Sequence, residues 1–411
     1  MRDPAATHYV GLDIGTFRVR CVIGTRDVHD PGTISVIGHG SAPNLGMRKG
    51  VVMHVEEVAE AVVQAITEAE RLSGVRIERA TVNVNGAHVL GINSKGVIAI
   101  SSPNREITIE DRERVEEAAT IVQLPPNREI LQVFAKNYRL DGQDNIKDPV
   151  GMRGVRLEVD CHIVTAASPN VRNLDIALEK AQVRPTHHTV SGLAAVEAVL
   201  DRKQKEAGTV LIDIGAGTTN LVVIEDGEVQ HVAVIPIGGS HITNDLAIGL
   251  RTDLDVAEIV KIKHASLHET KDSTVKLTVN EVAHQFSSAE VNMIVEARVD
   301  ELLDYVDKEL HRIRRSRKLP GGVVIVGGVA ALPGLAEFAR EKLQLAARIG
   351  KIRNLAGLVD TVDDPAFSTA SGLMLLDALL SPLMNDQADH HLILGNLNVL
   401  SQMFSKFKRG K

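Results

Sequence analysis

The sequence predicts an α/β protein of at least two domains, in which two halves of similar plan face one another across a cleft. The chain has 411 residues, more than a single hydrophobic core usually serves. Each half begins with a hairpin of the same design, read as YVGLDIGTFRVRCVIG from Tyr9 to Gly24 and as VLIDIGAGTTNLVVIEDG from Val210 to Gly227. In both, an apolar strand leads into Asp-Ile-Gly, and a second apolar strand follows.

Composition narrows the class of protein. Hydrophobic residues make up 44% and charged residues 24% of the chain, the balance of a soluble globular protein. Aromatic residues are only 2%, and the four basic residues after Leu397 leave the rest of the chain more acidic than its net charge of −7. Both features disfavour nucleic-acid binding, which uses aromatic stacking and basic surfaces. The two cysteines have no metal-type spacing and suit a reduced, cytosolic compartment.

Further elements follow from local patterns. Apolar residues at helical spacing predict a helix from Val55 to Leu72, and Thr108 followed by two acids predicts the start of another over 109–122. We expect an inserted α+β subdomain at 82–165, although this segment could also be part of the first domain. A long helix is expected over 280–317. The run VVIVGG at 323–328 is typical of a buried strand.

The second hairpin has the composition of a phosphate-binding turn. Small residues from Gly215 to Asn220 let backbone amides approach an anion. Asp213 at the strand end suits Mg²⁺, which prefers carboxylates and retained waters beside substrate phosphates. Asp13 offers the same from the opposite half. One such turn would be interpreted as an ordinary hairpin, but two acidic copies favour a binding site.

Gly327 and Gly328 end the VVIVGG strand, where α/β sheets commonly bind ligands. The pair would let a flat ring lie against the backbone, or would serve a close strand-to-helix crossing; both interpretations stay open. The sequence contains neither of the two common nucleotide loops, Gly-x-x-x-x-Gly-Lys-Ser/Thr and a helix-opening Gly-x-Gly-x-x-Gly.

Together, these hairpins and the Val-Gly-Gly motif resemble the phosphate and adenosine motifs of the actin, heat-shock chaperone and sugar-kinase ATPases. The resemblance is closer to the FtsA family of bacterial cell-division proteins, on GMRKGVV (46–52), NIKDPVGMRGVRLEVDCHIVT (145–165) and a basic amphipathic terminus. It implies an actin-like (ribonuclease-H-like) two-domain ATPase fold with an inserted α+β subdomain and a C-terminal amphipathic helix. The implied parts are 1–81 as the first half, the insert 82–165, and the second half with the return to the first over 166–380, with a subdomain at about 240–318. A linker 381–396 and a membrane helix 397–411 follow.

The resemblance also implies ATP and Mg²⁺ as cofactors, with Mg²⁺ held by Asp13 and Asp213, directly or through water. The implied nucleotide-binding residues are Asp13, Gly15, Thr16, Arg18, Asp213, Gly215, Gly217, Thr218, Thr219, Glu258, Lys261, Gly327 and Gly328. Asp213 is also the candidate catalytic residue, and Glu258 with Lys261 would otherwise be a solvated helical pair. Ala216 stands where many relatives have glycine. Ser191 occupies the place where efficient hydrolases carry Gln or Glu, so ATP binding with at most weak hydrolysis is expected.

The implied partners are the FtsZ C-terminal peptide, other copies of the chain, downstream division proteins and anionic lipid. For the peptide we expect Arg298 and Glu301, beside Val295, Val299 and Leu302; alternatively, Arg298 only pairs with acids of its own helix. The expected membrane-contacting residues share one amphipathic helix: Leu397, Leu400, Met403, Phe404, Lys406, Phe407, Lys408 and Arg409.

The resemblance thus implies a peripheral membrane protein at midcell, on the cytoplasmic face of the cell membrane. There it would anchor FtsZ filaments and help to assemble the division septum. The alternatives are a pilus-assembly ATPase with the same fold and a phosphotransferase of the sugar-kinase type.

Overall fold

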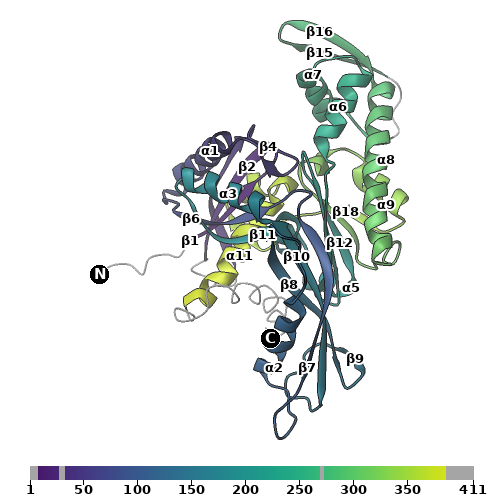
Figure 1. Ribbon diagram of the computed structural model, residues 1–411. Helices are drawn as coiled ribbons and strands as arrows, with labels where there is room; N and C mark the ends of the chain where they lie inside the picture. Colours follow the sequence, from purple (N-terminus) through teal and green to yellow (C-terminus); the bar gives the residue numbers. More distant parts are fainter. Residues whose placement is uncertain (1–7, 27–32, 269–272, 386–411) are drawn as a thin grey trace.

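The computed structural model describes residues 8–26, 33–268 and 273–385, with side chains up to residue 380. Two α/β halves lie side by side, an insert extends from one end, and a helical subdomain (the upper subdomain, residues 239–312) extends from the other (Figure 1). Among the described residues, no helix combines the length and apolarity needed to cross a membrane. The expected membrane helix 397–411 and most of the expected linker lie outside the described residues.

The first half is built on a six-stranded sheet in the order β11-β6-β1-β2-β3-β19. Its strands are β1 (His8–Ile14), β2 (Arg18–Arg26), β3 (Ile34–Pro43), β6 (Arg79–Val84), β11 (Arg184–Val190) and β19 (Leu355–Gly357). The predicted hairpin is confirmed, because every residue of β1 pairs antiparallel with β2. A two-stranded hairpin of β4 (Met47–Arg48) and β5 (Val51–Val52) precedes α1.

Helices cover both faces of this sheet at close range. The predicted helix is α1 (Val55–Ser73), whose Val58, Val62 and Ile66 are buried and which ends at a left-handed Gly74. A Cβ added to Gly40 of β3 would lie 2.0 Å from a carbonyl oxygen of α1. On the other face, a Cβ on Gly11 would lie 2.1 Å from a carbonyl oxygen of α11 (Ser368–Asn385). Glycine is therefore required where each helix crosses.

The second half and the insert share a nine-stranded sheet in the order β18-β17-β12-β13-β14-β7-β10-β8-β9. The strands of the second half are β12 (Thr209–Ile214), β13 (Thr219–Glu225), β14 (Glu228–Ile235), β17 (Gly322–Val326) and β18 (Ala347–Ile349). Its helices are α4 (Ser191–Val199), α5 (Arg202–Ala207) and α9 (Leu335–Leu343), with a 3-10 turn at Gly328–Ala331. The short α10 (Val359–Val362) and the 3-10 turn at Pro365–Phe367 pack against β1, β2 and β3 of the first half. The second predicted hairpin is confirmed as β12 and β13.

The insert contains β7 (Leu90–Ala99), β8 (Arg128–Leu140), β9 (Gln143–Ile146), β10 (Arg156–Ala167) and α2 (Ile109–Thr120). The side chains of Thr108 and Asp111 each bond the other's backbone N–H, the capping box that starts α2 as predicted. The insert has its own apolar core. It joins the second half through one strand pair, Leu90 of β7 with Ala233 of β14.

The structure corrects three expected boundaries. The insert cannot begin at residue 82, because β6 carries Val82 and Val84 into the first sheet, parallel to β1. The helix α3 (Ser168–Lys180) and strand β11 also belong to the first half, since β11 pairs with β6. The linker cannot begin at 381, because α11 continues to Asn385.

The expected helix over 280–317 is wrong at its beginning. Residues Val282–Ser287 form β16, which pairs with β15 (Thr274–Val279), and α8 spans Ser288–Arg312. The turn residues Asn280 and Glu281 have φ values of 49° and 66°, as a type I′ hairpin turn requires. With α6 (Gly239–Gly249) and α7 (Leu254–His264), these elements form the upper subdomain.

Candidate nucleotide-binding cleft

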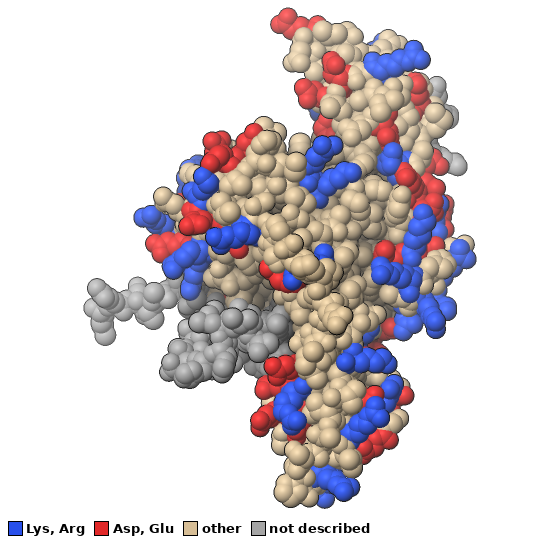
Figure 2. Space-filling model, viewed as in Figure 1, with Lys and Arg blue, Asp and Glu red and all other residues tan. Residues whose placement is uncertain are grey.

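The two hairpin turns meet at one cavity of about 360 Å³ between the halves. Figure 2 shows the notch between the first half and the upper subdomain, with Lys and Arg side chains at its edge. Predicted residues that line the cavity are Asp13, Gly15, Thr16, Arg18, Asp213, Gly215, Thr218, Glu258, Lys261, Gly327 and Gly328. The structure thus brings residues from both halves and from the upper subdomain to one place.

Both turns are closed by the same hydrogen bond. The Gly15 N–H donates to the Arg18 carbonyl at 3.1 Å, and the Gly215 N–H donates to the Thr218 carbonyl at 2.9 Å. The internal repeat in the sequence is therefore also a repeat in backbone geometry. The turns touch across the cleft, because a Cβ on Gly217 would lie 3.0 Å from the Thr16 side chain.

Gly217 and Thr219 do not line the cavity. Gly217 lies at the contact between the two turns, where a side chain would push them apart. Thr219 is fully buried and its hydroxyl donates to the Ile237 carbonyl at 2.8 Å. Because side chains alternate along β13, Thr219 points away from the cavity while Asn220 points into it. Its hydrogen bond to Ile237 therefore gives Thr219 a structural role.

Two buried aspartates face this cavity. Asp13 accepts a hydrogen bond from the Asn83 amide at 2.8 Å, and burial raises its pKa to about 7, opposed by Arg20 and reinforced by the charge of Asp213. Burial likewise raises the pKa of Asp213 to about 6, although Asn220 donates to this carboxylate at 3.2 Å. Buried carboxylates with raised pKa values lack sufficient positive charge nearby. A divalent cation would supply it.

The residues present fit Mg²⁺ bound with a polyphosphate. Within the described part of the chain, no group of three or more His, Cys, Asp or Glu could hold a metal ion. Two carboxylates alone suit Mg²⁺, which usually keeps several waters and completes its shell with substrate phosphates. The buried Asn220 Oδ1 also has no hydrogen-bond partner among the described residues, and a metal-bound water would satisfy it.

Arg20, Asn83 and Thr369 contribute to the site but were missed from the sequence. Asn220 was placed in the phosphate-binding turn, but its hydrogen bond to Asp213 was not predicted. Arg20 lines the cavity and is the cross-strand partner of Asp13. Period-two alternation along β2 places it on the same face as Arg18, a signal that could have found it. Asn83 bonds both Asp13 and Ser191, and Thr369 donates to Asp213 at 3.4 Å. Asn83 lies on β6 and Thr369 on α11, both far in the sequence from the Asp213 hairpin, so no local motif predicts their roles.

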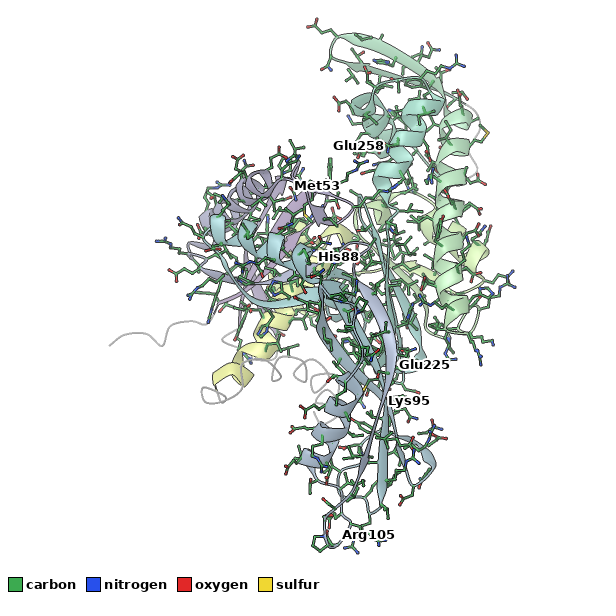
Figure 3. The ribbon with its side chains drawn as sticks, viewed as in Figure 1. Met53, His88, Lys95, Arg105, Glu225 and Glu258 are labelled. Atoms are coloured by element: carbon green, nitrogen blue, oxygen red, sulfur yellow. The ribbon has the colours of Figure 1, made fainter. Side chains whose placement is uncertain are left out.

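The opposite rim carries the predicted pair on α7. Lys261 forms an ion pair with Glu258 at 2.6 Å, and its ammonium also donates to the Thr243 hydroxyl at 2.9 Å. The pair is not simply solvated, since both residues line the cavity; Glu258 lies on the upper subdomain opposite Met53 of the first half in Figure 3. Gly328 has nothing within 4 Å of an added Cβ, which leaves room for a flat ring.

Arg298 on α8 has partners within the protein. Its guanidinium donates to both oxygens of Asp245 on α6 and forms an ion pair with Glu301. The expected apolar anchors Val295, Val299 and Leu302 are buried in the core of the second half and its upper subdomain. That part of the expectation is wrong, because their helical spacing directs them inward. A peptide at Arg298 would have to contact other side chains of α8.

Binding of Mg²⁺ with ATP is expected to weaken as the pH falls from about 8 to about 6. Metal binding requires ionised carboxylates, and the pKa of Asp13 is raised to about 7. The loss should be roughly tenfold across this range. Titration of fluorescent ATP with Mg²⁺ at several pH values measures it. The variant Asp13→Asn should show a shallower slope, due to Asp213 and to ATP itself; an equal slope in both proteins would contradict the assignment.

Comparisons with known proteins place this architecture. The solved PilM–PilN type IV pilus biogenesis complex matches with a TM-score of 0.63 and 18% identity, covering 90% of this chain and 98% of that chain. MreB5 of Spiroplasma citri bound to ADP matches with a TM-score of 0.56 and 13% identity, covering 93% and 100%. At such identities the fold alone is shared. Two α/β halves around a cleft with an inserted subdomain define an actin-like protein, as the sequence predicts.

Sequence comparison gives the family. The model described as cell division protein FtsA matches residues 210–372, and the model of the SHS2 domain inserted in FtsA matches residues 86–165. The cell division protein FtsA of Pseudomonas aeruginosa is 36% identical over 371 residues, which are 89% of this chain and 88% of that protein. The chain belongs to the FtsA family of cell division proteins.

Proposed function

We propose that the protein binds ATP with Mg²⁺ in the cleft and anchors FtsZ filaments to the cytoplasmic face of the cell membrane at midcell. In this role it helps to assemble the division septum together with downstream division proteins. The observation that carries the nucleotide part is the pair of buried aspartates, Asp13 and Asp213, presented by matching turns to one cavity. Membership of the FtsA family supports the division role.

The Asp13 and Asp213 carboxylates would hold Mg²⁺, partly through water, and the amides of both turns would bind the phosphates. Mg²⁺ would supply charge neutralisation between the phosphates and the two carboxylates. Gly327 and Gly328 would lie against adenine, and Glu258 with Lys261 would reach the ribose. Lys261 and Arg20 add positive charge around the polyphosphate.

Nucleotide binding serves as a conformational or assembly switch rather than as rapid turnover. Ser191 begins α4 at the cavity, and its hydroxyl is bonded to Asn83 at 3.0 Å. No glutamine is among the described residues that line the cavity, and the one glutamate, Glu258, is paired with Lys261. A hydroxyl without an adjacent base activates water poorly. We therefore expect at most weak hydrolysis of ATP, with Asp213 as the candidate catalytic group.

The tail LNVLSQMFSKFKRGK supplies the membrane contact in this proposal. On a helical projection Leu397, Leu400, Met403, Phe404 and Phe407 share one half, and Lys406, Lys408 and Arg409 lie in the other. Such a helix lies in the membrane interface with its basic face toward anionic headgroups. The sequence provides the support for this step, since residues 386–411 are outside the described part. In this proposal, membrane-bound copies of the chain also associate with one another, so that several copies hold one FtsZ filament.

Reversal of charge at Arg298 tests the FtsZ contact. The variant Arg298→Glu is expected to weaken binding of the FtsZ C-terminal peptide by about tenfold or more, because an acidic peptide loses a charge-assisted partner and meets repulsion. Fluorescence anisotropy with a labelled peptide measures this. Lys308→Glu is the matched control, a charge reversal on the same helix beside Tyr305. Equal affinities for both variants and the wild type would remove the peptide from this part of α8.

The two alternatives find less support. A pilus-assembly role would share the fold of the PilM–PilN structure, yet the family models match FtsA and its inserted domain. A sugar-kinase-type phosphotransferase needs an acid that activates a substrate hydroxyl. Four acids are among the described residues that line the cavity. In our proposal Asp13 and Asp213 hold Mg²⁺, and Glu258 is paired with Lys261. Only Asp364, at the rim, is then left among them for that role.

A further inference from the structure

A second polar cavity, of about 550 Å³, lies where the insert meets the second half, away from the nucleotide cleft. It occupies the fork at which β7 leaves β14, since these strands pair only at Leu90 and Ala233. Lys95 of the insert and Glu225 of the second half both line it, and they lie near each other in Figure 3. The proposed nucleotide chemistry does not use the residues of this cavity.

Lys136 is directed into this cavity by a break in strand register. Along β8 and β10, Asn137 pairs with Asp160 and Ala135 pairs with Cys161, which leaves Lys136 as an extra residue. Such a β-bulge re-aims a side chain that regular alternation would place elsewhere. The Lys136 ammonium donates to the Asn93 Oδ1 at 3.1 Å. Burial lowers the pKa of this lysine, and the charge of Asp160 opposes the shift.

The other cations of the cavity are already paired. Lys95 pairs with Asp160 at 3.3 Å, Lys147 with Asp226 at 3.6 Å, and Arg315 with Glu225 at 2.7 Å. Among the described residues, no carboxylate forms an ion pair with Lys136. The cavity therefore carries one uncompensated positive charge, held by a partly buried amine whose desolvation is only partly offset by a neutral amide.

These charges select the kind of ligand. A single carboxylate would balance Lys136, whereas a phosphate dianion would meet repulsion from the three acids that line the cavity. The volume is far larger than one carboxylate needs. Side-chain amides of Asn137, Asn145 and Gln230 also line it, and they can donate to and accept from a peptide backbone. Beyond Leu90, no described strand pairs with the outer edge of β7.

We propose that this cavity is a docking site for an acidic, extended peptide segment of another protein. A glutamate or aspartate of the peptide binds Lys136, and its backbone adds to the free edge of β7 in the manner of strand addition. The nearby exposed ion pairs rearrange at little cost, because such pairs contribute weakly to stability. The site would give the insert a partner of its own, separate from the FtsZ contact proposed on α8.

The probe for this site, called the Glu-Val peptide, is a labelled octapeptide of alternating Gln and Val in which one central Gln is replaced by Glu. Its valines favour extended backbone, and its single glutamate matches the single charge of Lys136. Fluorescence anisotropy with the full chain should detect salt-sensitive binding, and a Gln-Val octapeptide should bind weakly. Lys136→Gln should lower affinity by roughly tenfold, while Lys136→Arg retains most of it because the charge is kept. Lys180→Gln is the matched control, since this exposed lysine pairs with Glu56 away from the cavity.

Three outcomes would overturn the proposal. The first is equal affinity of Lys136→Gln and the wild type for the Glu-Val peptide. The second is loss of this binding in Arg298→Glu with retention in Lys136→Gln, which would move the acidic peptide to α8. The third is complete displacement by inorganic phosphate at concentrations comparable to the peptide, which would make this a small-anion site. Loss of FtsZ-peptide binding in Arg298→Glu alone would leave the proposal intact.

Discussion

Asp213→Asn is expected to weaken binding of ATP in the presence of Mg²⁺ by about 10- to 100-fold, since the lost charged interactions are each worth roughly 1.5–3 kcal/mol. The substitution keeps the shape of the side chain and the acceptor for Asn220, but removes the charge that Mg²⁺ requires. Titration of fluorescent ATP with and without Mg²⁺ measures the effect, which should nearly vanish when Mg²⁺ is omitted. Unchanged affinity with Mg²⁺ would remove this hairpin from the site.

The same variant should be no less stable than the wild type without nucleotide. Burial raises the pKa of Asp213 from 3.8 to about 6, so the folded protein holds this proton more tightly than the unfolded chain. The stability that this group contributes is therefore present at low pH and lost as the pH rises through that window. At about pH 8 asparagine removes the penalty of a buried charge, and the melting temperature should hold or rise.

Asp377→Asn provides the contrast. Asp377 on α11 is also buried, and it accepts hydrogen bonds from the Val10 N–H and from the hydroxyls of Thr81 and Thr186. These bonds fasten α11 to three strands of the first sheet. This substitution should lower the melting temperature while leaving the nucleotide affinity of the folded protein unchanged. The opposite responses separate a functional carboxylate from a structural one.

Phe404→Glu combined with Phe407→Glu should release the protein from anionic vesicles. Burial of one phenylalanine contributes roughly 1.5–3 kcal/mol, so the pair accounts for a loss of at least about 100-fold in binding. The basic residues would remain, each adding about 1 kcal/mol near an anionic surface. Vesicle sedimentation measures the release, and ATP binding should be unaffected. Wild-type binding should itself weaken as salt screens the headgroup charges.

Ser401→Glu combined with Ser405→Glu is the matched control for the tail. It makes the same change in charge, but on the polar half of the projected helix. Because the apolar face stays whole, this variant should keep most of its vesicle binding. Equal release by both double variants would show that net charge alone, and not an amphipathic helix, holds the tail to lipid.

Much of the fold could be predicted because its elements carry local signals. The two hairpins, α1 and α2 follow from apolar period, capping residues and the repeated Asp-Ile-Gly. The misassigned segments were decided by strand pairing rather than by their own apolar pattern. Residues 282–287 form a strand only because β15 pairs with them through a tight turn, and Val82 and Val84 lie in the first sheet because β1 accepts β6 as a parallel neighbour.

The site residues likewise fall into those that a local motif predicts and those that only the tertiary fold brings together. Asp13, Asp213 and the glycines of their turns were recognised because they repeat within the chain. Asn83 and Thr369 reach the aspartates from β6 and α11, and their roles depend on the tertiary fold. The pairing of Arg298 with Glu301 could be predicted, because both lie on one helix three residues apart. Its pairing with Asp245 could not be predicted, because Asp245 lies on another helix, α6.

Recruitment of FtsZ to vesicles tests the central claim most directly. FtsZ filaments, anionic vesicles, Mg²⁺ and ATP are combined with the wild-type chain or with the Phe404→Glu, Phe407→Glu variant, and FtsZ is quantified on floated vesicles. The wild-type protein should carry FtsZ to the vesicles, and the variant should leave it in solution although the variant still binds ATP. FtsZ that floats equally with both proteins, or with neither, would contradict the proposal that this chain anchors FtsZ to the membrane.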